Sequence, residues 1–283
     1  MDNMQVNSDT SSSIIQRSLN ASNKEAVKAM EKLAHGKQMN AIQDAAGNII
    51  ADQLEIQANG SQEASINVQA GANLLQTADS DLGSITENLQ RMRELALQAS
   101  NGTNGQEELD AIKSEISSLS DEIDRVSKTS SFSNINLLDG SNTNLSLQTG
   151  ANSDSTTNSM QIGSALQSVS TSSLGIPTGN NLDQSLSSSS GSYQMIDSID
   201  KALSTISDRR SSAGAMQNAL SSTLENLQVT SENLIASESL IRDTDVAKET
   251  SNLIKYQILE NASGSLLAQA NQNSSDVLAL LGA

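Results

Sequence analysis

The sequence predicts a mainly α protein: a long antiparallel helical bundle or coiled coil with a small β-hairpin region at its tip and paired N- and C-terminal helices. Three observations lead to this fold class. Apolar residues recur at alternating steps of three and four, which is the heptad pattern of packed helices. Proline occurs once in 283 residues, so long segments are free to be helical. The three aromatic residues suit a thin bundle with an aliphatic core better than a globular enzyme.

Three helical segments are predicted in the first half of the chain. The first ends near His35–Gly36, with Ile15, Leu19, Ala26, Met30 and Leu33 on one face. The second runs from about Ile49 to Ser100 and ends at a glycine-containing loop, SNGTNG. Its heptad seam consists of Val68, Gly71, Leu75, Ala78, Leu82, Ile85, Leu89, Met92, Ala96 and Ala99. The third begins with a predicted capping box, Asn104 and Glu107, and its seam is Leu109, Ile112, Ile116, Leu119, Ile123 and Val126.

The pattern changes between residues 129 and 192, where Ser, Asn, Thr and Gly dominate. The short apolar pieces INLLDG, NLSLQTG and NSMQIG are bounded by turn residues and predict β-hairpins. The stretch QSLSSSSGS is expected to be a flexible connector. Because the loop between the second and third helices is short, these two helices should be antiparallel.

Helical seams resume from Ile196 to Leu234, IRDTD interrupts them, and a last helix is predicted from about Val246 to Leu281. The two end helices each have an apolar face and no partner in the central bundle. If they pair with each other, a two-helix coiled coil still covers them poorly. We therefore expect neighbouring copies of the protein to cover them, in an assembly whose inner layer is built from the ends of the chain.

The composition excludes several functions. Thirty-three acidic against 16 basic residues give a formal charge of −17, so no basic patch is available to bind nucleic acid. With no cysteine and with His35 as the single histidine, neither a zinc site nor a histidine triad is expected, and the protein is not expected to be an enzyme or to need a cofactor. No run approaches the ~20 apolar residues of a membrane span. The start, MDNMQVNSDTSSS, lacks a basic segment followed by an apolar one, so we do not expect it to act as a cleavable signal peptide, and export would then need another route.

One stretch, NLQRMRELALQASNGT, is unusual in its pattern. Leu95 lies one residue off the seam of the second helix and shares a ridge with Arg91. An outward leucine beside an arginine is either ordinary exposed surface or a contact patch.

Long segments of the chain resemble bacterial flagellin. They are QDAAGNIIADQL, GANLLQTADSDLGSITENLQRMRELALQASNGT, LDAIKSEISSLSDEIDRVS, and NLQVTSENLIASESLIRDTDVAKETSNLIKYQILENASGSLLAQANQ followed by VLALL. The resemblance implies a subunit that self-assembles into the hollow filament of the flagellum for swimming motility. In this family the terminal helices form an inner tube, D0, and the middle helices form the D1 layer.

The resemblance also implies a division of the chain. It comprises a D0 helix (1–36), a linker (37–48), D1 helices (49–128), a β-hairpin and turn region (129–192), a further D1 helix (193–236), a second linker (237–246) and a second D0 helix (247–283). The variable outer domains of longer flagellins are missing. The stretch LAHGKQMNAIQDAAG departs from the family pattern, which puts subunit contacts at the D0–D1 turn in question.

Partners follow from the same resemblance: other copies of the chain, a type III export chaperone, a filament cap protein, hook–filament junction proteins and a flagellin-sensing Toll-like receptor. Self-assembly is expected through Ile15, Leu19, Met30, Leu33, Ile258, Leu259, Leu266, Leu267, Val277, Leu278 and Leu281. The chaperone is expected at Leu253, Ile254, Ile258, Leu266 and Leu278. The receptor motif of the family matches Arg91, Leu95 and Glu115. The mature protein would then be secreted and lie in the extracellular filament.

Two alternatives stay open at this point. A hook–filament junction protein of the same superfamily shares both ends with flagellin. The other alternative is a secreted coiled-coil effector or adhesin, which would not need both end helices to be apolar.

Overall fold

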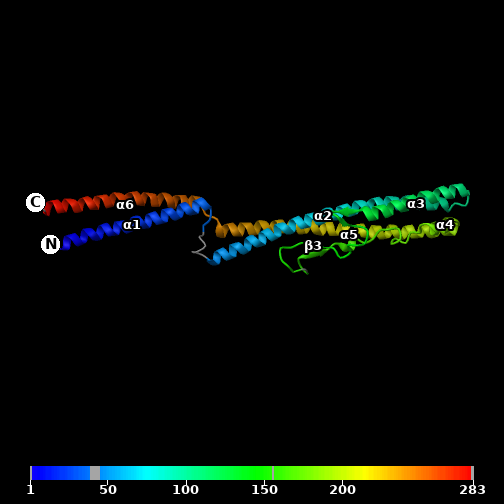
Figure 1. Ribbon diagram of the computed structural model, residues 1–283, viewed down its shortest axis with the longest axis horizontal. Helices are drawn as coiled ribbons and strands as arrows, with labels where there is room; N and C mark the ends of the chain where they lie inside the picture. Colours follow the sequence, from blue (N-terminus) through cyan, green and yellow to red (C-terminus); the bar gives the residue numbers. More distant parts are fainter. Residues whose placement is uncertain (1, 39–44, 155, 282–283) are drawn as a thin grey trace. The chain divides into compact units, whose positions relative to one another are not determined.

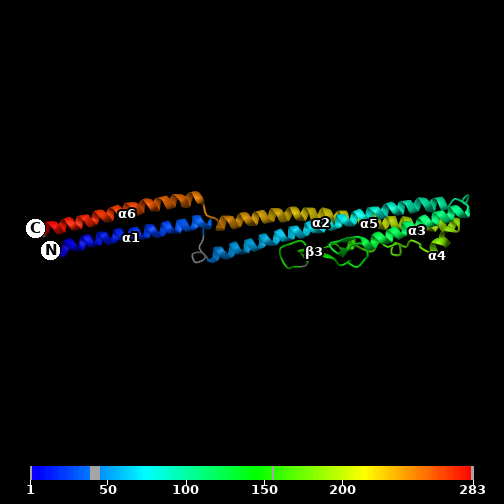
Figure 2. The ribbon, with the colours of Figure 1, turned by 45° about the horizontal axis from the view of Figure 1, so that its top comes forward.

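The computed structural model describes residues 2–38, 45–154 and 156–281, with side chains there except at 2–9, 189, 274 and 277–281. The chain divides into two units, which are described separately. The terminal-helix unit comprises Met1–Ile56 and Asn233–Ala283, and the central unit comprises Gln57–Glu232. Figures 1 and 2 show long helices throughout, with a small amount of β-structure. The mainly α prediction is confirmed.

Three long helices form most of the central unit: the greater part of α2 (Ala45–Ala99), α3 (Gln106–Thr129) and the greater part of α5 (Ser189–Arg242). Ion pairs between α2 and α5 show the relative direction of these two helices. Arg93 of α2 contacts Asp200 of α5 at 2.7 Å, and Arg210 of α5 contacts Asp79 of α2 at 2.8 Å. Because residue numbers rise on one helix as they fall on the other, α2 and α5 are antiparallel.

Helices α2 and α3 are antiparallel as well. Arg91 of α2 pairs with Glu115 in the first half of α3, and Ser130, just after α3, donates to Asp81 of α2 at 2.5 Å. The short loop between these helices leaves no other arrangement.

The predicted seam of α2 forms the core of this unit. All ten seam residues from Val68 to Ala99 are buried. These positions lie on one face of the helix and form an unbroken stripe that other elements cover. Two α2 leucines off the seam, Leu74 and Leu95, are also buried, each one position before a seam residue.

The β-structure consists of two small antiparallel hairpins. Strand β1 (Ser131–Phe132) pairs with β2 (Ile135–Asn136), and β3 (Ser146–Gln148) pairs with β4 (Ser159–Gln161). The sequence located these hairpins correctly but placed them at the tip of the bundle, and that placement is wrong. They lie along the side of α2, because a β-carbon on Gly71 would come within 2.3 Å of Leu147, and one on Gly60 within 2.9 Å of Ala151 (Figure 2).

The hairpins lie there because α3 is only 24 residues long and α2 is 55. Beyond the end of α3, α5 is the one long helix that still covers the α2 seam. The hairpin region supplies the missing cover, and glycine at the contact positions lets Leu147 approach the α2 backbone closely.

The loop after β4 is anchored by polar contacts. It contains the short 3₁₀-helix η1 (Gly163–Ala165). Arg209 donates to the carbonyls of Gln167 and Ser168 at 2.9 and 2.6 Å, and Asp124 accepts from the backbone of Thr171 at 2.7 Å. Burial lowers the pKa of Arg209.

Two local predictions in the central unit are wrong. The Ser-rich connector at 184–192 is largely helical, since α4 (Asn180–Leu186) and the start of α5 occupy it. Leu186 is buried and anchors α4, which explains the helix despite the serines. The capping box of α3 does not form: Gly105 is the N-cap without a side-chain bond, and Asn104 donates instead to the carbonyl of Gln98 at 2.6 Å.

The terminal-helix unit pairs α1 (Asp2–His35) with α6 (Val246–Leu281), as the sequence predicts. Figure 1 shows them side by side, α1 in blue and α6 in orange to red. Lys32 contacts Glu249 at 3.2 Å and Asn23 contacts Glu260 at 3.4 Å, so the helices are antiparallel. Their contact is lined by small side chains, chiefly Ser22, Ala26, Ala29 and Ser263, all buried.

The ends of α1 and α5 meet in a short antiparallel ladder. Thr244 donates its backbone N–H to Gly36 at 2.9 Å, and Gln38 donates to Arg242 at 2.7 Å. Helix α5 runs to Arg242, so the first part of the predicted linker 237–246 is helical. The other predicted linker, 37–48, falls partly on residues 39–44, which lie outside the described residues.

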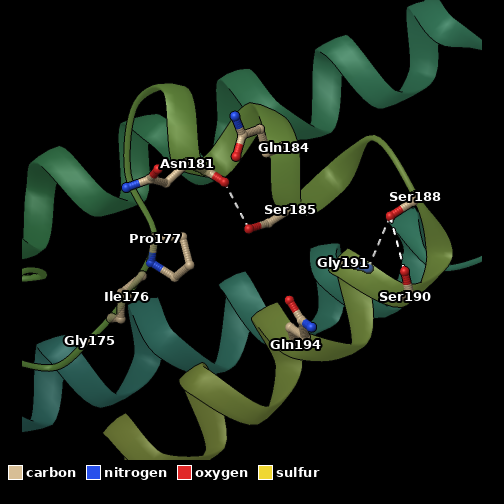
Figure 3. Close-up of a pocket in the computed structure, with 10 residues that line it drawn as sticks. All are labelled: Gly175, Ile176, Pro177, Asn181, Gln184, Ser185, Ser188, Ser190, Gly191 and Gln194. Atoms are coloured by element: carbon tan, nitrogen blue, oxygen red, sulfur yellow. Dashed lines mark hydrogen bonds between the residues drawn. The ribbon is translucent and has the colours of Figure 1, made fainter.

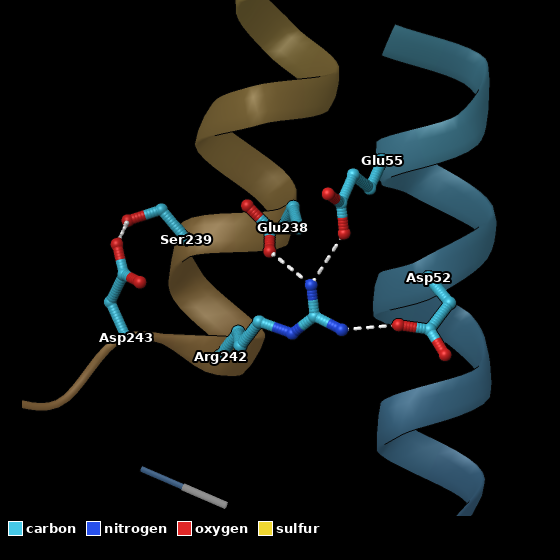
Figure 4. A network of polar contacts seen from close by, with 6 residues as sticks. All are labelled: Asp52, Glu55, Glu238, Ser239, Arg242 and Asp243. Carbon is cyan, nitrogen blue, oxygen red and sulfur yellow. Dashed lines mark hydrogen bonds and ion pairs between the residues drawn. The ribbon is translucent and has the colours of Figure 1, made fainter. Parts of the chain in front are cut away.

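Arg242 stabilises the end of α5. Its guanidinium contacts Glu55 at 2.7 Å, Glu238 at 3.0 Å and also Asp52 (Figure 4). The hydrogen bond to Glu55 raises the pKa of Arg242. The positive charge of Arg242 thus contacts three carboxylates of α2 and α5 and offsets the repulsion between them.

We expect a charge at the centre of the α2 seam to destabilise the central unit. Leu89 is fully buried, so Leu89→Glu places an unpaired carboxylate in the core and should cost about 3–5 kcal/mol. Chemical denaturation followed by circular dichroism measures this loss. The control is Leu97→Glu on the same helix, where the leucine is 56% exposed and the denaturation curve should stay close to that of wild type. Equal stability of the two variants would contradict the seam.

We expect acid to weaken the turn between Asp139 and Ser141. Its carboxylate accepts from the hydroxyl and the backbone N–H of Ser141, and these bonds lower the pKa of Asp139. A lowered folded-state pKa means that the stabilisation is complete above the usual value, about 3.9, and is lost as the pH falls below it. Asp139→Asn keeps an acceptor oxygen that cannot titrate. Its melting temperature should therefore fall less on acidification than that of wild type, and an identical fall would contradict this role.

Candidate self-assembly surface and receptor-contact residues

Exposed apolar side chains gather in the terminal-helix unit. Among the described residues, thirteen of the seventeen exposed large apolar side chains belong to it, and four belong to the larger central unit. The thirteen are Ile14, Val27, Met30, Ile49, Ile50, Ile56, Ile235, Leu240, Val246, Ile254, Ile258, Leu259 and Leu266. Scattered exposed apolar residues are normal, whereas such a concentration on a few helices marks a contact surface.

The spacing on α6 explains why these residues are exposed. Ile254, Ile258 and Leu266 share one helical face, at steps of four and eight, and are 51–62% exposed. The side of α6 turned to α1 carries Tyr256, Ser263 and Leu267, which are half-buried or buried. Helix α6 therefore has more apolar surface than one partner helix can cover, and the stripe containing Ile258 lies outside the pair.

The predicted assembly residues divide between these two sides. Ile15, Leu19, Leu33 and Leu267 are half-buried within the α1–α6 pair. Met30, Ile258, Leu259 and Leu266 are exposed. The side chains of Val277, Leu278 and Leu281 lie outside the described residues. The sequence analysis assigned the half-buried and the exposed residues to one face, because the apolar pattern of α6 is wide enough to include both.

The parts of α2 and α5 within this unit add to the apolar surface. Ile56 is 72% and Leu240 86% exposed, and Ile49, Ile50 and Ile235 are more than half exposed. None of these five lies on the predicted seam of the central bundle. A search for apolar residues off the seam in these two segments would have found them.

Of the predicted chaperone residues, Ile254, Ile258 and Leu266 are exposed and Leu253 is half-buried. Leu278 has no described side chain. Three of the five thus lie on the uncovered stripe of α6, which coincides with the predicted assembly surface.

The predicted receptor residues are partly brought together. Arg91 of α2 donates to Glu115 of α3 through Nε at 2.9 Å, and its guanidinium also contacts Glu94 at 3.1 Å. The hydrogen bond to Glu115 raises the pKa of Arg91. Arg91 and Glu115 are both about half exposed, so they form a charged pair accessible from solvent.

Leu95 requires a correction. The sequence placed it on the outward side of α2, but its side chain is only 2% exposed and belongs to the core. It lies one turn after Arg91, on the side of α2 that faces α3. Because α2 packs against both α3 and α5, its buried face is wider than one heptad seam, and Leu95 falls within it.

A polar hollow of about 500 Å³ lies between α4 and the start of α5 (Figure 3). Its lining contains amides and hydroxyls, including Asn181, Gln184, Ser185 and Gln194, over Ile176 and Pro177. None of its lining residues is charged, so it offers no general acid or base. Nowhere in the described part of the chain do three or more His, Asp or Glu side chains group as metal ligands would. Over the same residues, no helix is long and apolar enough to cross a membrane.

Comparisons with known proteins agree with this arrangement. The bacterial flagellin N-terminal helical region matches residues 6–143, and the bacterial flagellin C-terminal helical region matches residues 196–281. The flagellin of Halalkalibacterium halodurans is 41% identical, over 90% of this chain and 91% of its own. The flagellin of Bacillus subtilis is 38% identical over 93% and 95%. The flagellar filament 33 kDa core protein of Treponema phagedenis is 35% identical over 98% and 100%. The chain therefore belongs to the bacterial flagellin family, a family of structural proteins.

Proposed function

We propose that this flagellin is a structural subunit that self-assembles into the filament of the bacterial flagellum, outside the cell, for swimming motility. The observation that carries the proposal is the uncovered apolar surface of the terminal-helix unit, above all the stripe of Ile254, Ile258 and Leu266 on α6. A helix pair with this much exposed apolar surface is unfavourable alone, and copies of the same chain are the natural cover.

The energetics support assembly through many copies. Fully burying one large aliphatic side chain contributes about 1.5–3 kcal/mol. Thirteen exposed side chains spread over four helical segments cannot all be covered by one neighbour, so each subunit would contact several others. Head-to-tail contacts between different surface patches produce open helical filaments when the rotation does not close.

The other partners proposed for this chain are a type III export chaperone, a filament cap protein and hook–filament junction proteins. The chaperone proposal rests on Ile254, Ile258 and Leu266, which in the free subunit need protection from water and from premature assembly. The two alternatives from the sequence, a junction protein and a secreted effector or adhesin, have less support, since the relatives described above are flagellins and a filament core protein.

We expect the double variant Ile258→Glu, Leu266→Glu to fold but not to form filaments. Both side chains point away from α1, so pairing with α1 should persist while two charges oppose packing between copies. Sedimentation and electron microscopy after seeding with filament fragments measure assembly, and circular dichroism measures helix content.

The matched control is Gln257→Glu, Ser265→Glu. It adds the same charge to the same helix at neighbouring exposed positions that are already polar. This control should assemble to at least part of the wild-type extent. Filaments formed equally well by the Ile258, Leu266 variant would remove the basis of the proposal.

We further propose that a flagellin-sensing Toll-like receptor contacts Arg91 and Glu115. The support is their half-exposed ion pair across α2 and α3. Leu95 belongs behind this pair as a packing residue rather than as a contact residue, because it is buried.

We expect Arg91→Ala to affect receptor activation and Leu95→Ala to affect stability. Arg91→Ala should reduce receptor activation while leaving the melting curve unchanged, because exposed ion pairs contribute little to stability. Leu95→Ala removes a buried side chain and should cost about 2–5 kcal/mol. A receptor reporter assay beside thermal melting separates the two effects. Full receptor activation by Arg91→Ala would rule out this contact.

A further inference from the structure

The loop between α2 and α3 contains two asparagine–glycine pairs, Asn101–Gly102 and Asn104–Gly105. A third pair, Asn59–Gly60, lies inside α2. Asn101 is exposed and Asn104 half-buried, and both lie outside the helices. The chain therefore offers the same dipeptide in three different settings.

Asparagine before glycine can react with its own backbone. The backbone nitrogen of the glycine loses its proton and attacks the side-chain carbon Cγ of the asparagine. A C–N bond forms, the Cγ–Nδ2 bond breaks, and ammonia leaves, which gives a five-membered succinimide. Water then opens the ring at either carbonyl and yields aspartate or isoaspartate. In total, water is consumed and ammonia released, with no change of oxidation state.

The geometry separates the three pairs. Oδ1 of Asn101 accepts the backbone N–H of Thr103 at 3.4 Å, which folds the side chain back over the peptide bond to Gly102 and polarises its carbonyl. The amide of Asn104 is held differently, because Nδ2 donates to the carbonyl of Gln98 at 2.6 Å. Asn59 is fixed in helical backbone, with ψ of about −42°, which does not allow the ring to close.

We propose that Asn101 is a site of spontaneous deamidation, at which the subunit gains one negative charge as it ages. The charge arises two residues after the end of α2, where the helix dipole disfavours an anion. The isoaspartate product inserts an extra methylene into the backbone of an exposed loop. That product is the chemical class of substrate used by enzymes that methylate isoaspartyl carboxylates.

The test is an incubation of the full chain in mildly alkaline buffer made with isotopically labelled water. Trypsin then releases residues 94–113, which contain both loop asparagines, and a separate peptide that contains Asn59. Fragmentation by mass spectrometry locates the labelled oxygen. Asn101 should react about tenfold faster than Asn59 and faster than Asn104.

Gly102→Ala is the decisive variant. A β-carbon at Gly102 meets nothing within 4 Å, so the substitution fits the loop while shielding the attacking nitrogen. It should slow the reaction at Asn101 about tenfold, with an unchanged circular dichroism spectrum. The matched control Gly105→Ala should leave the rate at Asn101 unaltered. Equal rates at Asn101 and Asn59, faster reaction at Asn104, or a wild-type rate in Gly102→Ala would each overturn the proposal.

Discussion

Two paired helices can bury only the side of each that faces the other, and the rest of this structure depends on that constraint. Helices α1 and α6 bury one narrow stripe each, lined by Ala26, Ala29 and Ser263. Their remaining apolar residues, such as Ile14 and Ile258, face solvent. Small side chains in the contact bring the helices close, but they contribute little apolar area. The terminal-helix unit is therefore folded but leaves apolar side chains exposed. Contacts between copies in a polymer can bury these side chains.

In the central unit, elements of the same chain cover the apolar face of the longest helix. Its longest helix, α2, is covered by α3, α5 and the β-hairpins, so every residue of its seam is buried. Glycine at 60 and 71 lets the hairpins lie directly on the helix where α3 has ended. Ion pairs at Arg93 and Arg210 then fix how α5 lies against α2. The central unit covers its apolar seam within one chain, whereas the terminal-helix unit leaves apolar side chains exposed, as expected of a subunit that polymerises through its terminal helices.

Most of the helical architecture could be predicted from the sequence, because a heptad repeat directly encodes a buried stripe. The seam from Val68 to Ala99 and the pairing of the two end helices are confirmed. Features that depend on several elements at once could not be predicted. Leu95 is buried because α2 has two helical neighbours, a property of packing that one helix's periodicity does not contain. Likewise, the serines at 187–190 look flexible by composition, but burial of Leu186 fixes the helix beside them. On α6, the apolar pattern was too broad to show which stripe faces α1.

Hydrogen exchange of the full chain, read by mass spectrometry as monomer and as filament, tests the central claim most directly. In the monomer, α1 and α6 should exchange much faster than the α2 seam, because their pairing buries little apolar surface. In the filament, both helices should become protected to the level of α2, since neighbouring subunits bind only the folded form. Monomeric α1 and α6 that are already as protected as α2, with no further protection in the filament, would contradict the account.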